Sequence, residues 1–86
     1  MELNHQMQHE LRRLSELSAQ LKGVETLWAE SYMNRQKAEE RGEGMHIVCG
    51  YSVMIMNSAD KIAEIKNKIV EHVHLLAAHM DAQGED

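Results

Sequence analysis

Apolar residues in the second half of the chain recur with a seven-residue spacing that predicts one long helix. Five of them follow this spacing without interruption: Val48, Ile55, Ile62, Ile69 and Leu76. If these residues take heptad position a, Tyr51 and Ile65 take position d. Apolar side chains at a and d are typical of a helix that packs against another helix. We therefore expect a helix over about 45–81, followed by a frayed tail over 82–86.

The first half of the chain shows the same spacing with more exceptions. Position a holds Met7, Leu14, Leu21 and Trp28, and position d holds Leu3, Glu10, Leu17, Val24 and Ser31. Leu11 and Tyr32 flank this stripe at position e, as expected when a straight helix drifts against a strict heptad repeat. The pattern predicts a helix over about 2–41. Gly23 lowers helix propensity by about 1 kcal/mol relative to alanine, so a shorter first helix that ends there is an alternative.

The segment "ERGEGM" separates the two patterns and predicts a turn over residues 42–44. Gly42 suits the left-handed conformation that ends many helices, and Gly44 lets the chain reverse. So short a connection makes the helices antiparallel neighbours. A lone hairpin buries only one seam, and 86 residues is near the lower size limit for a single core. We expect one all-α domain, residues 1–86, in which two hairpins pair as a homodimeric four-helix bundle.

Residues 44–59, "GMHIVCGYSVMIMNSA", carry no formal charge, although 27% of the whole chain is charged. Apolar side chains surround the expected helix here on nearly all sides, which is typical of a helix that is buried all round or binds another molecule. We expect an intersubunit surface next to the turn, with Trp28 and with Ile47, Val48, Tyr51, Met54, Ile55 and Met56.

Two alternatives remain for this uncharged stretch. It could be an exposed docking surface for another protein, because methionines make a surface that adapts to its partner. It could also contain a strand over 46–56, since several of its residues favour strands and Ser58 could cap a helix that begins after it. A single strand lacks a pairing partner in the first half of the chain, so we predict a helix.

Histidines gather near the two chain ends, which an antiparallel hairpin brings together. His5 and His9 have the i,i+4 spacing that zinc-binding helices use, and His79 falls at the same end. These three residues are candidates for a metal site. The spacing alone is weak evidence, and solvated surface histidines are the simpler interpretation, so we expect neither a metal nor a cofactor.

Glu10, His72 and His79 all occupy position d and are expected to form a polar layer between the helices. Such a layer fixes the register at some cost in stability and responds to pH. The alternative is that Leu11 and Val73 take these places and leave the polar side chains at the rim.

No catalytic motif is present: the chain lacks a glycine-rich phosphate loop, Cys-x-x-Cys and His-Glu-x-x-His. Cys49 lies in the apolar stretch and is expected to be buried and unreactive. A single cysteine and the absence of a signal sequence favour the cytoplasm. The net charge of −5 argues against nucleic-acid binding, and the uncharged stretch is shorter than the roughly twenty apolar residues that span a bilayer.

Three classes of function remain for a chain that is not expected to be an enzyme. The first is a small regulatory or adaptor protein, of the inhibitor, antiactivator or chaperone type, that binds another protein through a methionine-rich surface near the turn. The second is a purely structural oligomerisation module. The third is a metal-binding or pH-sensing bundle that uses the terminal histidines.

Overall fold

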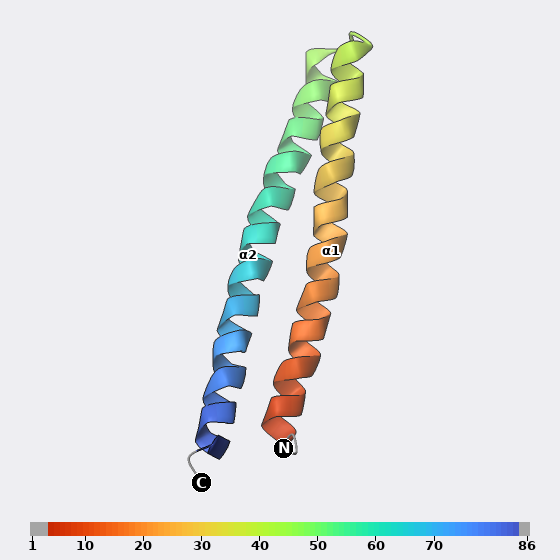
Figure 1. Cartoon of the computed structure of the whole chain (residues 1–86). Helices are drawn as coiled ribbons and strands as arrows, with labels where there is room; N and C mark the ends of the chain where they lie inside the picture. Colours follow the sequence, from red (N-terminus) through yellow and green to blue (C-terminus); the bar gives the residue numbers. More distant parts are fainter. Residues whose placement is uncertain (1–3, 85–86) are drawn as a thin grey trace.

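The computed structural model describes residues 4–84 and contains two helices, α1 (His5–Glu40) and α2 (Met45–Gly84). They lie side by side and antiparallel, joined by a short turn at one end (Figure 1). The Cα atoms span 66 × 15 × 14 Å. The predicted all-helical hairpin is confirmed. Leu3, expected at position d, lies outside the described residues.

α1 begins with a side-chain cap and continues without a break. Oδ1 of Asn4 accepts a hydrogen bond from the backbone N–H of Met7 at 2.8 Å, which satisfies one of the first N–H groups that have no partner within the helix. The helix passes through Gly23, so the alternative of a shorter first helix is wrong. Leu17 and Ser31 are buried on either side of Gly23, and such tertiary burial outweighs local propensity.

Gly42 ends α1 in the predicted left-handed conformation. Its φ of 69° is one that residues with a side chain rarely adopt. The N–H of Glu43 donates to the carbonyl of Ala38 at 3.0 Å, and the N–H of Gly42 donates to the carbonyl of Glu39 at 3.1 Å. These are the two hydrogen bonds of a Schellman motif. The turn is therefore specified by residues within it.

α2 passes through the uncharged stretch as a regular helix. The hydroxyl of Ser58 donates to the carbonyl of Met54 at 2.7 Å, so it bonds within the helix instead of capping a new one. The alternative of a strand over 46–56 is therefore wrong. α2 also extends to Gly84, further than the expected end near 81.

The seam between the helices is formed mainly by position d of both. The buried residues within the described range are Met7, Glu10, Leu17, Ser31, Ala38, Ser58 and Ile65, and all except Met7 occupy position d. Position a of α2 is only half-buried along its whole length, from Val48 to Leu76. The helices therefore touch along their d positions, and the a positions face one side of the hairpin.

This core is small for the length of the chain. The chain exposes 6374 Å², whereas a compact monomer of 9.9 kDa exposes about 5,200 Å². The excess is roughly 1,200 Å². Many large apolar side chains remain exposed on both helices, among them Leu27, Trp28, Met54, Met56 and Val70. The elongated hairpin thus exposes more total surface than a compact protein of this size, and large apolar side chains are part of that surface.

Candidate protein-binding site

Residues with the same heptad letter lie on the same side of an antiparallel hairpin. With position d at the contact, positions a and e face one side and position g faces the other, because successive helical residues are about 100° apart. A shallow groove on the first side confirms this geometry, since both helices line it with residues at a, b and e: Glu25, Trp28, Ala29, Ala59, Ile62 and Lys66. The two sides can therefore be considered separately.

α2 carries a wide apolar face on the first side. Position b holds Cys49, Met56, Ala63, Val70 and Ala77, and position e holds Ser52, Ala59, Lys66, Val73 and Met80. Positions a, b and e between Val48 and Met80, which we call the α2 apolar face, include only one charged residue, Lys66. The other charged residues of α2 lie at c, f and g: Asp60, Lys61, Glu64, Lys68, Glu71 and Asp81.

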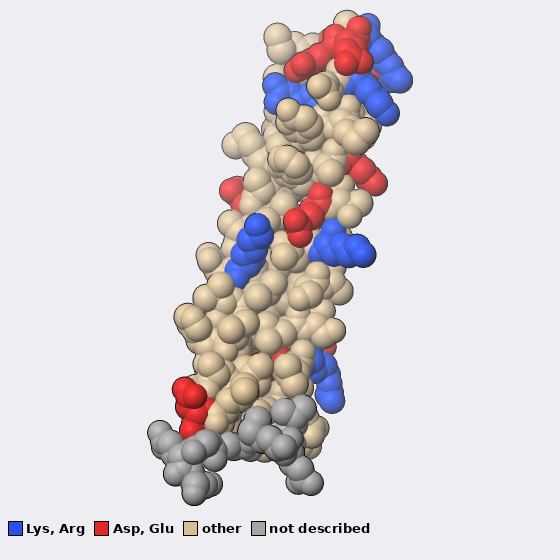
Figure 2. Space-filling model, viewed as in Figure 1, with Lys and Arg blue, Asp and Glu red and all other residues tan. Residues whose placement is uncertain are grey.

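α1 contributes less to this side than α2. Its position b is mostly polar, with Gln8, Ser15, Lys22, Ala29 and Gln36. Its main apolar contribution is Trp28, whose ring stacks on that of Tyr32 with centroids 5.6 Å apart. Trp28 is still 38% exposed, so it borders the groove instead of filling the seam. In the view of Figure 2, charged side chains gather around the turn and others lie near the middle, whereas the stretch between the middle and the end opposite the turn is mostly uncharged.

The interface residues predicted from the sequence lie on two sides and do not form one continuous surface. Val48, Ile55, Met56 and Trp28 face the first side, and Tyr51 is half-buried in the seam. Ile47 and Met54, at position g, face the second side. The antiparallel register places Leu27 of α1 at the level of Met54 on this same side.

We call Leu27, Ile47 and Met54 the turn-end patch. These side chains are 44%, 38% and 42% exposed. The side chains of the turn-end patch remain exposed because the small residues Ser31, Ala38 and Ser58 fill the seam in this half of the hairpin. The larger apolar side chains of the patch therefore have no space between the two helices.

Two features of the first side were not predicted. Cys49 is exposed in the single hairpin, so α1 does not provide the burial that was predicted for it: position b points away from α1. Beyond Met56, position b of α2 was not singled out as a surface. Its signal is present in the sequence, since Ala63, Val70 and Ala77 continue the seven-residue spacing of Cys49 and Met56.

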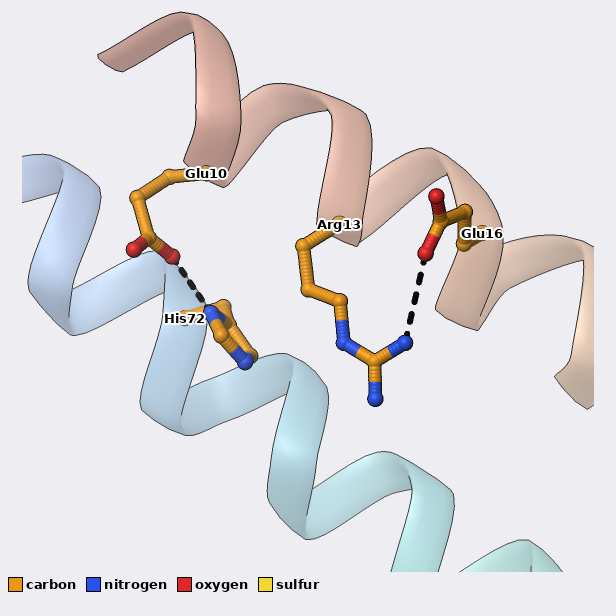
Figure 3. A network of polar contacts seen from close by, with 4 residues as sticks. All are labelled: Glu10, Arg13, Glu16 and His72. Carbon is orange, nitrogen blue, oxygen red and sulfur yellow. Dashed lines mark hydrogen bonds and ion pairs between the residues drawn. The ribbon is translucent and has the colours of Figure 1, made fainter. Parts of the chain in front are cut away.

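The far end of the hairpin contains a polar contact across the two helices. Nδ1 of His72 and Oε2 of Glu10 share a hydrogen bond (Figure 3), in which His72 donates because an ionised carboxylate can only accept. Glu10 is buried whereas Leu11 is exposed, so the polar residue occupies the seam. The hydrogen bond from His72 holds the pKa of Glu10 below its ordinary value, burial opposes this shift, and the charges of His72, His9 and His79 add to it.

The candidate metal ligands line one groove beside this contact. His5, His9 and His79 border it together with Gln6 and Glu10. Within residues 4–84, no three His, Cys, Asp or Glu side chains are arranged so that they could hold a metal ion. The structure therefore brings these histidines to one end of the hairpin without converging them on a single point.

Comparisons with known proteins do not place this chain in a family. The chain matches no family model, no curated protein and no solved structure. Neither helix, over the part of the chain that the structure describes, combines the length and the apolar character needed to cross a membrane. Three features of the hairpin bear on its function: the α2 apolar face, the turn-end patch and the polar contact of Glu10 with His72.

Proposed function

We propose that this chain is a small, non-catalytic adaptor or regulatory protein that acts by binding another protein. The observation that carries this proposal is the turn-end patch, in which Leu27, Ile47 and Met54 remain 38–44% exposed on one side of the hairpin. Large contiguous apolar surfaces on proteins mark interaction sites. Inhibitors, antiactivators and chaperones that act by capture all require such a surface.

The turn-end patch is the part of this surface that we assign to a partner protein. Leu27, Ile47 and Met54 carry no charge, and Gly50 lies beside them, where an added side chain would meet open space. A partner backbone can approach closely over a glycine. The apolar side of an amphipathic helix fits a surface of this kind, so we propose such a helix as the binding element of the partner.

The methionine of the turn-end patch supports this assignment. Met54 is 42% exposed. Methionine side chains are flexible and polarizable, and they let one surface adapt to different apolar partners. A purely structural module would instead need these side chains to be covered by further copies of the chain.

The experiment compares Met54→Glu with Met33→Glu as a matched control. Both residues are exposed methionines, but Met33 lies at position f of α1, away from the turn-end patch. We expect the assembled wild-type protein to bind a hydrophobic dye and to capture a partner from its native host by cross-linking. Both signals should fall strongly in Met54→Glu and remain in Met33→Glu, with helix content unchanged in both variants.

The purely structural alternative predicts a different result. An assembled wild-type protein that binds no dye, and captures nothing that depends on Met54, would contradict the adaptor function. It would show that copies of this chain cover the turn-end patch.

A further inference from the structure

We infer that the α2 apolar face is covered by a second copy of this chain, with the two α2 helices antiparallel across a two-fold axis near Ile62. This inference concerns the side of the hairpin opposite the turn-end patch. It therefore holds or fails independently of the proposed partner protein.

The size of the face matches what a stable dimer requires. From Val48 to Met80 the face is about 48 Å long at 1.5 Å per residue, and the side of the hairpin on which it lies, α1 included, is 15 Å across. The product for that whole side is about 700 Å², close to the roughly 800 Å² that each partner contributes to a specific protein interface. The roughly 1,200 Å² of excess surface is large enough to include this area.

The spacing of position a makes the face complementary to itself. Ile62 is the central residue of the uninterrupted row. Reversal of the row about Ile62 brings Ile55 to the level of Ile69 of the second copy, and Val48 to the level of Leu76 of the second copy. A closed two-fold interface needs this property, because the same surface must fit both partners.

The groove on the first side lies at the proposed axis. Ala29 and Ala59 are its smallest lining residues, beside the larger Trp28 and Ile62. Small residues between large ones form a hole into which an apolar side chain of a facing helix can insert. An aliphatic side chain from row a of the second copy, such as Ile62, has the required size and position.

The charges of the groove favour the antiparallel arrangement. Lys66 and Glu25 line this groove, and neither forms an ion pair in the described part of the hairpin. Reversal about Ile62 brings Lys66 of one copy to the level of Glu25 of the other. A parallel arrangement would instead place Lys66 beside Lys66 of the second copy, and like charges at an interface oppose association.

Cys49 provides a direct probe of this geometry because it is the only cysteine in the chain and is exposed. Reversal about Ile62 brings Cys49 of one copy to the level of residue 75 of the other. At 1.5 Å per residue, nitroxide labels on Cys49 of the two copies should therefore lie about 40 Å apart. A parallel pair of α2 helices would give less than about 20 Å, because packed helices lie 8–10 Å apart. A short distance, or no dipolar signal at all, would overturn the inference.

A second label position guards against disturbance of the face by the label itself. His46 lies at position f, outside the α2 apolar face. In a Cys49→Ser background, nitroxide labels on His46→Cys of the two copies should lie about 48 Å apart, because residue 46 of one copy falls at the level of residue 78 of the other. Agreement of both positions with one two-fold axis would support the arrangement, whereas a short distance from His46→Cys would contradict it.

A matched pair of substitutions tests which surface is used. Ala59→Lys places a positive charge at the centre of the face, beside Lys66 of the second copy, and Ala78→Lys places one at position c; both alanines are exposed in the hairpin. Sedimentation should show the dimer weakened roughly tenfold or more in Ala59→Lys and unchanged in Ala78→Lys. Equal dimerisation of the two variants would overturn the inference. The label distances decide the question even if Ala59→Lys fails to fold.

Discussion

Truncation of Leu17 to alanine tests the register on which the whole hairpin depends. Leu17 is 0% exposed and Ile65 is 1% exposed. Leu17 lies seven residues after Glu10, and Ile65 lies seven residues before His72. Because Glu10 and His72 are hydrogen-bonded across the two helices, Leu17 and Ile65 also lie opposite each other. Within residues 4–84, they are the two large aliphatic side chains in position d that are fully buried, so Leu17→Ala removes the main apolar contact of this layer.

The expected loss in the free energy of unfolding is about 2–3 kcal/mol. Leucine-to-alanine changes at buried sites cost about 2–5 kcal/mol, and the loss is smaller where neighbours close over the cavity. Only two helices surround Leu17, so partial closure is easy. A chain of 86 residues has a total stability of about 4–13 kcal/mol, and the variant should therefore be visibly destabilised.

Urea unfolding followed by circular dichroism measures this loss, with every variant at the same protein concentration because association adds to stability. Leu27→Ala is the control: Leu27 is 44% exposed, so the same change should cost about 1 kcal/mol or less. The double variant Leu17→Ala with Ile65→Ala should deviate from additivity by about 0.5 kcal/mol or more, as expected for residues in contact. Full additivity, or equal losses for Leu17 and Leu27, would refute the register.

Three further predictions follow from single contacts. Folding lowers the pKa of Glu10 below its ordinary value of about 4.5. The stabilisation from ionised Glu10 is therefore present above that pH and is lost as the pH falls through the lower pKa of the folded protein. Acid unfolding of Glu10→Gln should lack this loss. Ser31→Ala should raise the free energy of unfolding by about 1 kcal/mol in urea, since the buried Ser31 hydroxyl has no hydrogen-bond partner among the described residues. Gly42→Ala should lower it by about 1 kcal/mol in thermal unfolding, because φ at Gly42 is 69°.

The helices and the turn could be predicted because local chemistry and long-range packing agree there. The heptad row from Val48 to Leu76 requires a long amphipathic helix, and Gly42 supplies the one conformation that the end of α1 needs. The contact of Glu10 with His72 was also accessible from the sequence, since both residues fall at position d on helices that a short turn makes antiparallel.

The division of the apolar residues between seam and surface could not be predicted in the same way. A heptad pattern treats a and d as equivalent, whereas a pair of helices makes its closest contact along one row. In this chain row d makes that contact, although it contains the small residues Ser31 and Ser58. Trp28 at position a and Cys49 at position b therefore remain exposed.

The central claim is that the hairpin leaves an apolar surface that a second copy covers, and the mass of the wild-type protein in solution tests it most directly. Sedimentation equilibrium over a wide range of protein concentration should give about twice the chain mass of 9.9 kDa. The population of single chains should increase only on dilution, as mass action requires. A mass of 9.9 kDa at every concentration, with full helix content, would contradict the account.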